Sequence, residues 1–336
     1  MRALRDSMTS TVQRHLVVLE RIFHQAVETN DTVDMFHLLN RFTMEAFTEI
    51  SFGAHMNCLD ADKEHPFQTA FDRSQQLFVL RFVRPSWFWK TQRLLDRSRG
   101  PSEKEHGRDQ LYYLRHWRQR HHSLFLDDLN KSGDADESCF DPTYLRDIVV
   151  NFIIAGRDTT VQALSWFFYC LSKNPQVEAK IREEVAAKLP KLFNGQCSPS
   201  MDEVGCAKGD AASVSFCPHC QQGSSSDTVL SDGTFIAMYA LGRMPHVWGP
   251  DAAEFKAELW IDSGKLISVS AYQFVAFNAG PRLCLGKNLA MLEMKLIVAS
   301  LLSKYHVELE SPENVTYAIS FTLPVKGQLN AKITAV

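Results

Sequence analysis

The chain has 336 residues, of which 45% are hydrophobic and 22% are charged, and its formal net charge is -3. This is the composition of an ordinary folded protein with a sizeable core, and it excludes a disordered chain. The near-neutral balance gives no reason to expect a nucleic acid partner. The eight cysteines are irregularly spaced, which favours reduced thiols over a disulfide framework.

The first residues, MRALRDSMTSTVQRH, are charged from the start and lack the apolar core of a signal peptide or a membrane anchor. From residue 12 to residue 52 apolar side chains recur at helical spacing. This spacing predicts two amphipathic helices, with a turn around Asn30 and Asp31 between them.

A second helical pattern, rich in aromatic residues, runs from Phe67 to Leu95 and is broken by Pro85. The next stretch, residues 93–122, is rich in arginine and histidine. Its histidine spacing does not suit a metal site, so we interpret it as a solvated helix face, with a docking surface for an anionic partner as the alternative.

Asp141 followed by Pro142 predicts a helix start, because the side chain can cap the first turn and proline needs no donor there. A long helix follows as far as Leu171, apolar on more than one face, and it is expected to cross the middle of the molecule. The polar residues 157–160 exclude a lipid-exposed span. Another start signal at Asn174 and Pro175 predicts an exposed amphipathic helix that ends near Pro190.

Residues 193–231 lose this periodicity and are predicted to form an irregular segment. A short strand is expected around 234–238, a loop through 248–260, and a final helix at about 287–305 followed by strands. Within the irregular segment, Cys217, Pro218, His219 and Cys220 resemble half of a zinc site. No second ligand pair completes the site.

The strongest motif is FVAFNAGPRLCLGKNLA, in which Phe277, Gly280, Arg282, Cys284 and Gly286 fit the pattern F-x-x-G-x-R-x-C-x-G. Backbone N–H groups and the start of the following helix can stabilise a metal-bound thiolate. The glycines allow a tight turn and a close approach to a porphyrin, Arg282 can pair with a propionate, and Phe277 can shield the sulfur. The alternative is an inert buried cysteine before a helix.

This loop resembles the haem-binding signature of the cytochrome P450 monooxygenases. The resemblance implies a mainly α, cytochrome P450 fold with small β elements, incomplete here, in which residues 1–336 form a single partial haem-thiolate domain. It also implies haem b as cofactor, with Cys284 as the ligand of the iron. A thiolate ligand favours cleavage of the O–O bond over reversible oxygen binding.

The segment AGRDTT, residues 155–160, resembles the acid–alcohol pair that this family places over the haem. Gly156 would leave room for dioxygen, while Asp158 and Thr159 would act catalytically by relaying protons through water. The alternative is a polar kink in a core helix, where a threonine bonds back to the carbonyl one turn earlier.

Further stretches, among them ISFGAHMNCLD, RFVRPSWFWK and YALGRMPHVWGPDAAEF, resemble the branch that oxidises the terminal carbon of long-chain fatty acids. The implied function is insertion of one oxygen atom from O2 into an aliphatic substrate. The implied partners are a small hydrophobic substrate and a separate NADPH-cytochrome reductase. The family location is the cytosolic face of the endoplasmic reticulum membrane; without the anchor this chain would be cytoplasmic or peripheral.

The chain departs from the family pattern in three places. The membrane anchor, the first strands and a haem-contacting Trp and Arg are expected before Met1, and the match of Trp89 and Arg93 to W-x-x-x-R is taken as chance. No Glu after Thr160 has an Arg three residues on, and Glu105 with Arg108 lies upstream of the central helix.

The third departure is the run from Ala257 to Trp260, where the family has Pro-Glu-Arg-Trp and Leu259 replaces the arginine. The missing Glu-x-x-Arg helix would fall in residues 193–231, which favours a deletion or an aberrant segment there. A rival hypothesis is therefore a non-catalytic remnant that does not hold haem. A third is a zinc-binding or interaction module built on residues 193–231.

Overall fold

In the computed structural model the described residues are 2–52, 151–193, 238–256, 265–318 and most of 320–336, with short stretches at 220–222, 234–236 and 260–262 and scattered positions between 55 and 91. The chain forms two compact units. One consists of residues 1–43 and 156–336, and the other of residues 44–155. Each unit is described by itself.

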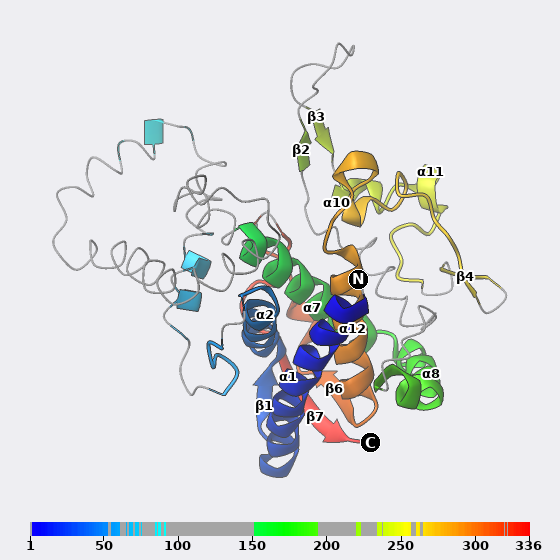
Figure 1. The fold of residues 1–336 in the computed structure, drawn as a ribbon. Helices are drawn as coiled ribbons and strands as arrows, with labels where there is room; N and C mark the ends of the chain where they lie inside the picture. Colours follow the sequence, from blue (N-terminus) through cyan, green and yellow to red (C-terminus); the bar gives the residue numbers. More distant parts are fainter. Residues whose placement is uncertain are drawn as a thin grey trace. The chain divides into compact units, whose positions relative to one another are not determined.

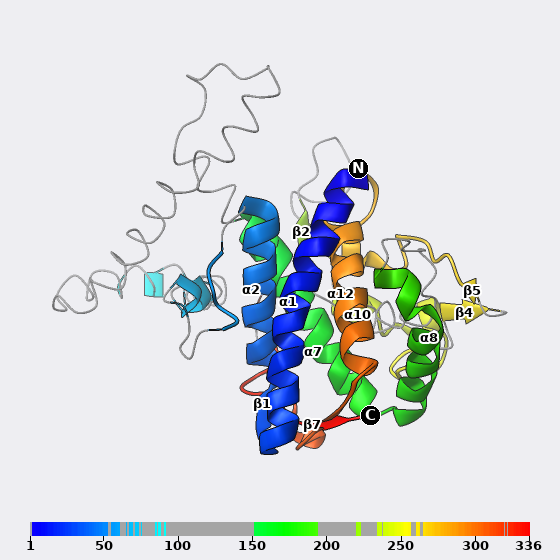
Figure 2. The same cartoon turned by 60° about the horizontal axis from the view of Figure 1, so that its bottom comes forward.

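The first unit is mainly helical, as the sequence predicts. Its long helices pack around α12, which contacts α1, α7 and α8, and Figures 1 and 2 both show α1 running beside α12. The helices that lie in this unit, α2 only in part, are α1 (Arg2–Thr29), α2 (Met35–Phe52), α7 (Thr159–Ser172), α8 (Pro175–Phe193), α10 (Met238–Leu241), α11 (Pro245–Trp248) and α12 (Lys287–Leu302).

The two N-terminal helices, α1 and α2, confirm the prediction of two amphipathic helices. In α1 the buried apolar residues follow one face, with Leu16, Leu19 and Phe23 at 2% exposure or less. The chain reverses after α1 at Asn30, whose φ of 56° lies in the left-handed region that asparagine tolerates. The predicted turn is therefore present, and a short strand, β1 (Thr32–Asp34), follows it.

α7 confirms the prediction of a helix that is apolar on more than one face, because each residue from Thr160 to Phe168 is buried. A π-helical turn, Ile154–Asp158, leads directly into it. α8 begins at Pro175 as expected but continues to Phe193, past the predicted end near Pro190.

A three-stranded antiparallel sheet of order β1-β7-β6 completes the first unit. β6 (Tyr305–Leu309) pairs with β7 (Asn330–Ala335), with Val307 opposite Ile333. These strands fulfil the expectation of strands after the last helix, which ends at Leu302. Two further pairs are very short: β2 (Cys220–Gln222) with β3 (Thr234–Ile236), and β4 (Ile261–Asp262) with β5 (Lys265–Leu266).

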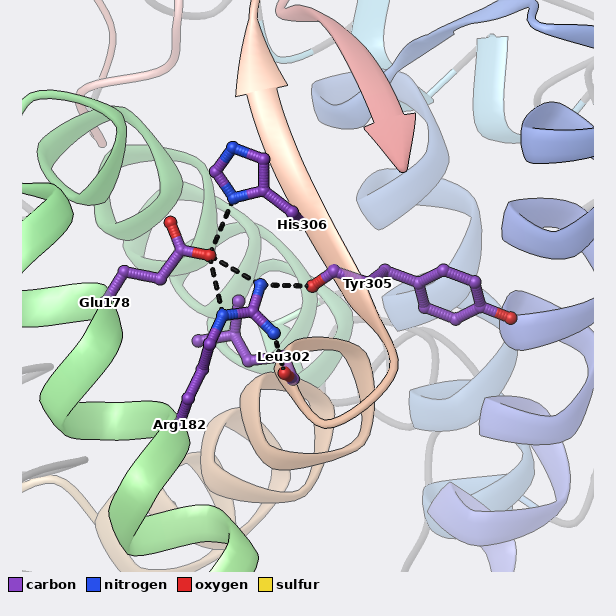
Figure 3. Close-up of polar contacts among 5 residues, drawn as sticks. All are labelled: Glu178, Arg182, Leu302, Tyr305 and His306. Carbon is purple, nitrogen blue, oxygen red and sulfur yellow. Dashed lines mark hydrogen bonds and ion pairs between the residues drawn. The ribbon is translucent and has the colours of Figure 1, made fainter. Parts of the chain in front are cut away.

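An arginine of α8 ties that helix to the end of α12. Arg182 donates through Nη1 to the carbonyl of Leu302 and through Nη2 to the carbonyl of Tyr305 at 2.6 Å. Its Nε lies 2.9 Å from Glu178 Oε1, and the same oxygen lies 2.8 Å from Nδ1 of His306 (Figure 3). We call Glu178, Arg182 and His306 the α8 clamp. Within the clamp, Glu178 and Arg182 are four residues apart, whereas the Glu and Arg of the family's Glu-x-x-Arg motif are three residues apart.

The second unit has a small apolar core of its own. Met44, Phe47, Cys58, Phe67, Phe71 and Ile153 form one buried cluster. Glu45 accepts hydrogen bonds from the backbone N–H groups of Met56 and Cys58, at 3.1 and 2.7 Å.

Several sequence predictions fall outside the described residues. These are the start of the central helix at Asp141, the Arg- and His-rich stretch, the pairs Trp89 with Arg93 and Glu105 with Arg108, most of 193–231 and residues 257–259. Among the helices that the structure describes, none combines the length and apolarity needed to cross a membrane.

Candidate functional site

The cysteine loop, residues 277–286, is shaped by backbone hydrogen bonds. The N–H of Cys284 donates to the carbonyl of Phe277 at 2.8 Å, and the N–H of Leu283 donates to the carbonyl of Gly280 at 3.1 Å. Two residues within the turn that the first bond closes have positive φ: Asn278 at 58° and Gly280 at 57°. The loop therefore folds back on itself and delivers Cys284 to the start of α12, which begins at Lys287.

The two motif glycines differ in what they contribute. The positive φ of Gly280 is a conformation that side chains disfavour, which fits the expected tight turn. Gly286 has φ of -82° and ψ of 0°, which other residues adopt readily, so the turn does not require a glycine there. A Cβ at Gly286 would lie 3.9 Å from the Cys284 sulfur, so the small residue keeps that side of the sulfur open.

Behind the loop lies an aromatic cluster that fixes its base. Trp260, Phe274 and Phe277 are all buried, and the ring of Phe274 lies 5.2 Å from that of Trp260 and 6.1 Å from that of Phe277. The ammonium of Lys287 lies 5.7 Å from the centre of the Phe277 ring. Phe277 is thus anchored on the protein side, and its carbonyl holds the backbone of Cys284.

The opposite side of the loop is exposed and largely apolar. Cys284 and Arg282 are exposed, Leu283 is 43% exposed, and Leu285 is 99% exposed. A thiol flanked by two apolar side chains and one guanidinium suits an apolar, anionic group that would cover them. The residues present therefore fit haem, with its apolar macrocycle and propionates, and the cysteine is not the buried inert thiol of the alternative reading.

The AGRDTT segment covers most of a π-helical turn, which interrupts the central helix between residue 153 and α7. Such turns interrupt the regular hydrogen bonding of an α-helix and occur often at functional sites. Thr160 is buried and donates to the carbonyl of Gly156 at 3.0 Å, so the back-bonding threonine of the structural alternative is present. Thr159 is only half-buried, and Asp158 beside it is 6% exposed.

A buried polar network lies next to Asp158. Arg157, 1% exposed, has its Nη1 3.3 Å from Asp158 Oδ1, and its Nη2 donates to Asn40 Oδ1 at 3.0 Å. Asn40 comes from α2 and donates through Nδ2 to the carbonyl of Phe36 at 2.8 Å. Reasoning from the sequence assigned no role to Asn40 or Arg157, since nothing in their spacing links positions 117 residues apart.

Reasoning from the sequence also assigned no role to Glu293. It is on α12, nine residues after the cysteine, and it is 3% exposed, with no hydrogen-bond partner for its Oε1. Burial raises the pKa of this carboxyl to about 8. The signal was available, because Glu293 stands at helical spacing from Leu289 and Leu296, where the pattern predicts an apolar residue.

The structure thus gathers the predicted residues into two groups. Phe277, Gly280, Arg282, Cys284 and Gly286 share one loop, while Asp158 ends the π-helical turn and Thr159 begins α7 directly after it. Among the described residues, no three His, Cys, Asp or Glu side chains cluster as metal ligands. Cys217 and His219, half of the suggested zinc site, lie outside the described residues, and Cys220 begins β2.

Comparison with known proteins places these features in context. The family model of the cytochromes P450 matches residues 1–204 and 227–330. Cytochrome P450 86B1 of Arabidopsis thaliana is 34% identical over 353 residues, covering 94% of this chain and 62% of that protein. Cytochrome P450 94C1 of the same plant is 33% identical and covers 90% of this chain and 66% of its own length. The chain thus spans about three fifths to two thirds of these relatives.

Another relative covers the chain only in part. Alkane hydroxylase MAH1 of Arabidopsis thaliana is 37% identical over 201 residues, covering 57% of this chain and 40% of that protein. Among solved structures, a cytochrome P450 (CYP102L1) superposes with a TM-score of 0.75 at 19% identity, over 100% of this chain and 75% of that one. This likeness shows the fold and confirms the predicted fold class.

Proposed function

Because the chain belongs to the cytochrome P450 family, we propose that it binds haem b through Cys284 and inserts one oxygen atom from O2 into an aliphatic substrate. The observation that carries this proposal is the exposed sulfur of Cys284, delivered by a backbone-shaped loop to the start of α12. A long-chain fatty acid is the proposed substrate, supported by the resemblance to the terminal-oxidising branch. The name of one relative, an alkane hydroxylase, agrees with an aliphatic substrate.

The residues of the cysteine loop would hold the cofactor. Cys284 lies two residues before the cap of α12, where the helix dipole would stabilise the charge of an iron-bound thiolate. Arg282, exposed beside it, would pair with a propionate, while Leu283 and Leu285 would cover apolar edges of the macrocycle. When bound, haem with a thiolate ligand supplies the activation of dioxygen.

The residues of the AGRDTT segment would move protons. Thr159, half-buried, would hold a water molecule through its hydroxyl, and the carboxylate of the neighbouring Asp158 would exchange protons with that water. Gly156, in the π-helical turn, has no side chain and would leave room for dioxygen.

The proposed electron donor is NADPH acting through a separate reductase, as the family resemblance implies. The proposed location, taken from the family resemblance, is the cytosolic face of the endoplasmic reticulum membrane. Co-reconstitution with a cytochrome P450 reductase tests the donor, because product should form only when both proteins and NADPH are present.

The deciding experiment is a carbon monoxide difference spectrum of the reduced, haem-loaded chain. We expect a thiolate-type Soret band that Cys284→Ala removes and that Cys170→Ala retains. Cys170 is the matched control, because it is a thiol of the same first unit that lies on α7. An unchanged band in Cys284→Ala contradicts the proposal, and a wild-type chain that takes up no haem supports the rival, a non-catalytic remnant.

The substrate class needs a separate titration. A long-chain fatty acid should shift the Soret band of the ferric protein, and the alkane of equal carbon number should do so more weakly if the chain recognises the carboxylate. Equal shifts would instead indicate recognition of the aliphatic chain alone.

A further inference from the structure

Arg157 is the largest fully buried side chain among the residues that the structure describes. It precedes Asp158 in the π-helical turn that opens α7. A guanidinium remains charged in proteins, so taking it out of water is costly unless its donors find partners. What holds Arg157 therefore matters for the carboxylate beside it.

One partner of Arg157 from elsewhere in the chain is Asn40 of α2. Its Oδ1 accepts from Arg157 Nη2 at 3.0 Å, and its Nδ2 donates to the Phe36 carbonyl at 2.8 Å. The second bond fixes which way the amide faces, because only its oxygen can accept from the guanidinium. Asn40 is itself only 8% exposed, so water competes little for these bonds.

We propose that Asn40 is a positioning residue: it fixes the Arg157 guanidinium, which in turn holds the Asp158 carboxylate where proton delivery is proposed. This inference rests on the proposed function of Asp158. Three contacts link the backbone of α2 to the carboxylate. Asn40 donates to the Phe36 carbonyl and accepts from Arg157 Nη2, and Arg157 Nη1 lies 3.3 Å from Asp158 Oδ1. Asn40 touches none of the reacting atoms in this scheme and acts only through Arg157.

The first test needs no cofactor. A double-mutant cycle joins Asn40→Leu, which removes the acceptor at similar volume, with Asp158→Asn, and urea unfolding is measured for all four proteins. We expect the two changes to be non-additive by roughly threefold or more in the unfolding equilibrium constant, since both act on Arg157. Ser165→Ala is the control partner. Its buried hydroxyl bonds to the Val161 carbonyl, and its effect should add to that of Asp158→Asn.

The second test uses the haem-loaded chain with its reductase. Asn40→Leu should leave the thiolate-type carbon monoxide band in place. It should lower the product formed per NADPH by about fivefold or more, with hydrogen peroxide rising to match, because proton delivery is impaired. Asn40→Asp keeps an acceptor oxygen for Arg157 but loses the donor to the Phe36 carbonyl, so it should restore the yield only in part, to at least about twofold above that of Asn40→Leu.

The outcomes separate this inference from the proposed function. An additive cycle, or a normal product yield in Asn40→Leu, overturns the positioning role. A yield that falls equally in Asn40→Asp and Asn40→Leu also overturns it, because the loss would not depend on the acceptor. If the wild type binds no haem, the proposed function fails, and the cycle alone still decides whether Asn40 holds Asp158.

Discussion

The two ends of the α12 region present opposite surroundings. At its N-terminal side every residue from Gly280 to Gly286 is exposed, and backbone hydrogen bonds alone set the shape of the loop. At its C-terminal side the residues from Leu296 to Leu302 are all buried, and Arg182 binds the carbonyls at the helix end. One end offers a surface to be covered, and the other anchors the helix.

The difference indicates how this chain can present a cysteine loop without the Glu-x-x-Arg pair of its family. The α8 clamp and the contacts of α12 with α1 and α8 fix the helix from its far end. The loop then follows from the helix start, from two left-handed residues and from the buried aromatic cluster beneath it. Substitutions in the anchored half should therefore cost stability, and substitutions in the exposed half should mainly affect binding.

The largest effect on stability is expected at Glu293 in the anchored half. Its folded pKa of about 8 lies above the ordinary value of 4.5, so the stability that its protonated form provides is complete below pH 4.5 and is lost as pH rises to 8. Over this window the loss amounts to at most about 5 kcal/mol. Urea unfolding across the window should show the decline in wild type and a much flatter profile in Glu293→Gln.

The matched control is Glu183→Gln, which removes an exposed carboxyl from α8. Its stability profile should run parallel to that of wild type. Parallel profiles for wild type and Glu293→Gln would mean that the Glu293 carboxyl is solvated or paired, against the burial described above.

The next largest effect is expected at Arg182. Arg182→Met removes the hydrogen bonds to the carbonyls of Leu302 and Tyr305 and the ion pair with Glu178. We expect a loss of about 2–3 kcal/mol in the free energy of unfolding, measured with urea. Arg182→Lys should recover only part of it, because one ammonium cannot reproduce the fork geometry.

For the contrast between the two ends to hold, the haem-loaded fraction of folded Arg182→Met should still give the wild-type carbon monoxide band. A carbon monoxide band at a different wavelength from that of wild type would mean that the α8 clamp shapes the cysteine loop directly.

The sequence predicted those parts of the molecule that depend on local pattern. Amphipathic spacing located α1, α2, α8 and α12, and the start signal at Asn174 and Pro175 located the beginning of α8. The cysteine loop was recognisable because its residues are contiguous. The polar networks were not, since Asn40 with Arg157 and Arg182 with Tyr305 are brought together only by helix packing. β2 was also missed, because it lies within residues 193–231, which the sequence predicted to be irregular.

In the exposed half, the loss in the free energy of unfolding should be smaller, and it should differ between substitutions at Gly280 and at Gly286. Gly280→Ala forces a side chain into a backbone conformation with φ of 57°, although the nearest atom to the new Cβ, Tyr272 Oη, is 4.0 Å away. The cost is therefore conformational and about 1–2 kcal/mol. Gly286→Ala should leave the urea midpoint almost unchanged, since its φ of -82° suits alanine.

The same pair of variants can be compared in haem uptake. Gly286→Ala narrows the space near the Cys284 sulfur and should reduce uptake more than its stability change predicts. If uptake instead follows stability in both variants, the small residue at 286 serves only the fold.

The smallest effect is expected at His306, the outer member of the α8 clamp. Its Nδ1 lies 2.8 Å from Glu178 Oε1, but its side chain is 42% exposed, whereas that of Arg182 is 20% exposed. Water can replace the imidazole, so His306→Ala should cost less than about 1 kcal/mol in urea unfolding. A loss as large as that of Arg182→Met would show that the three clamp residues act as one unit. The anchor of α12 would then extend to β6 through a side chain, and not only through the Tyr305 carbonyl.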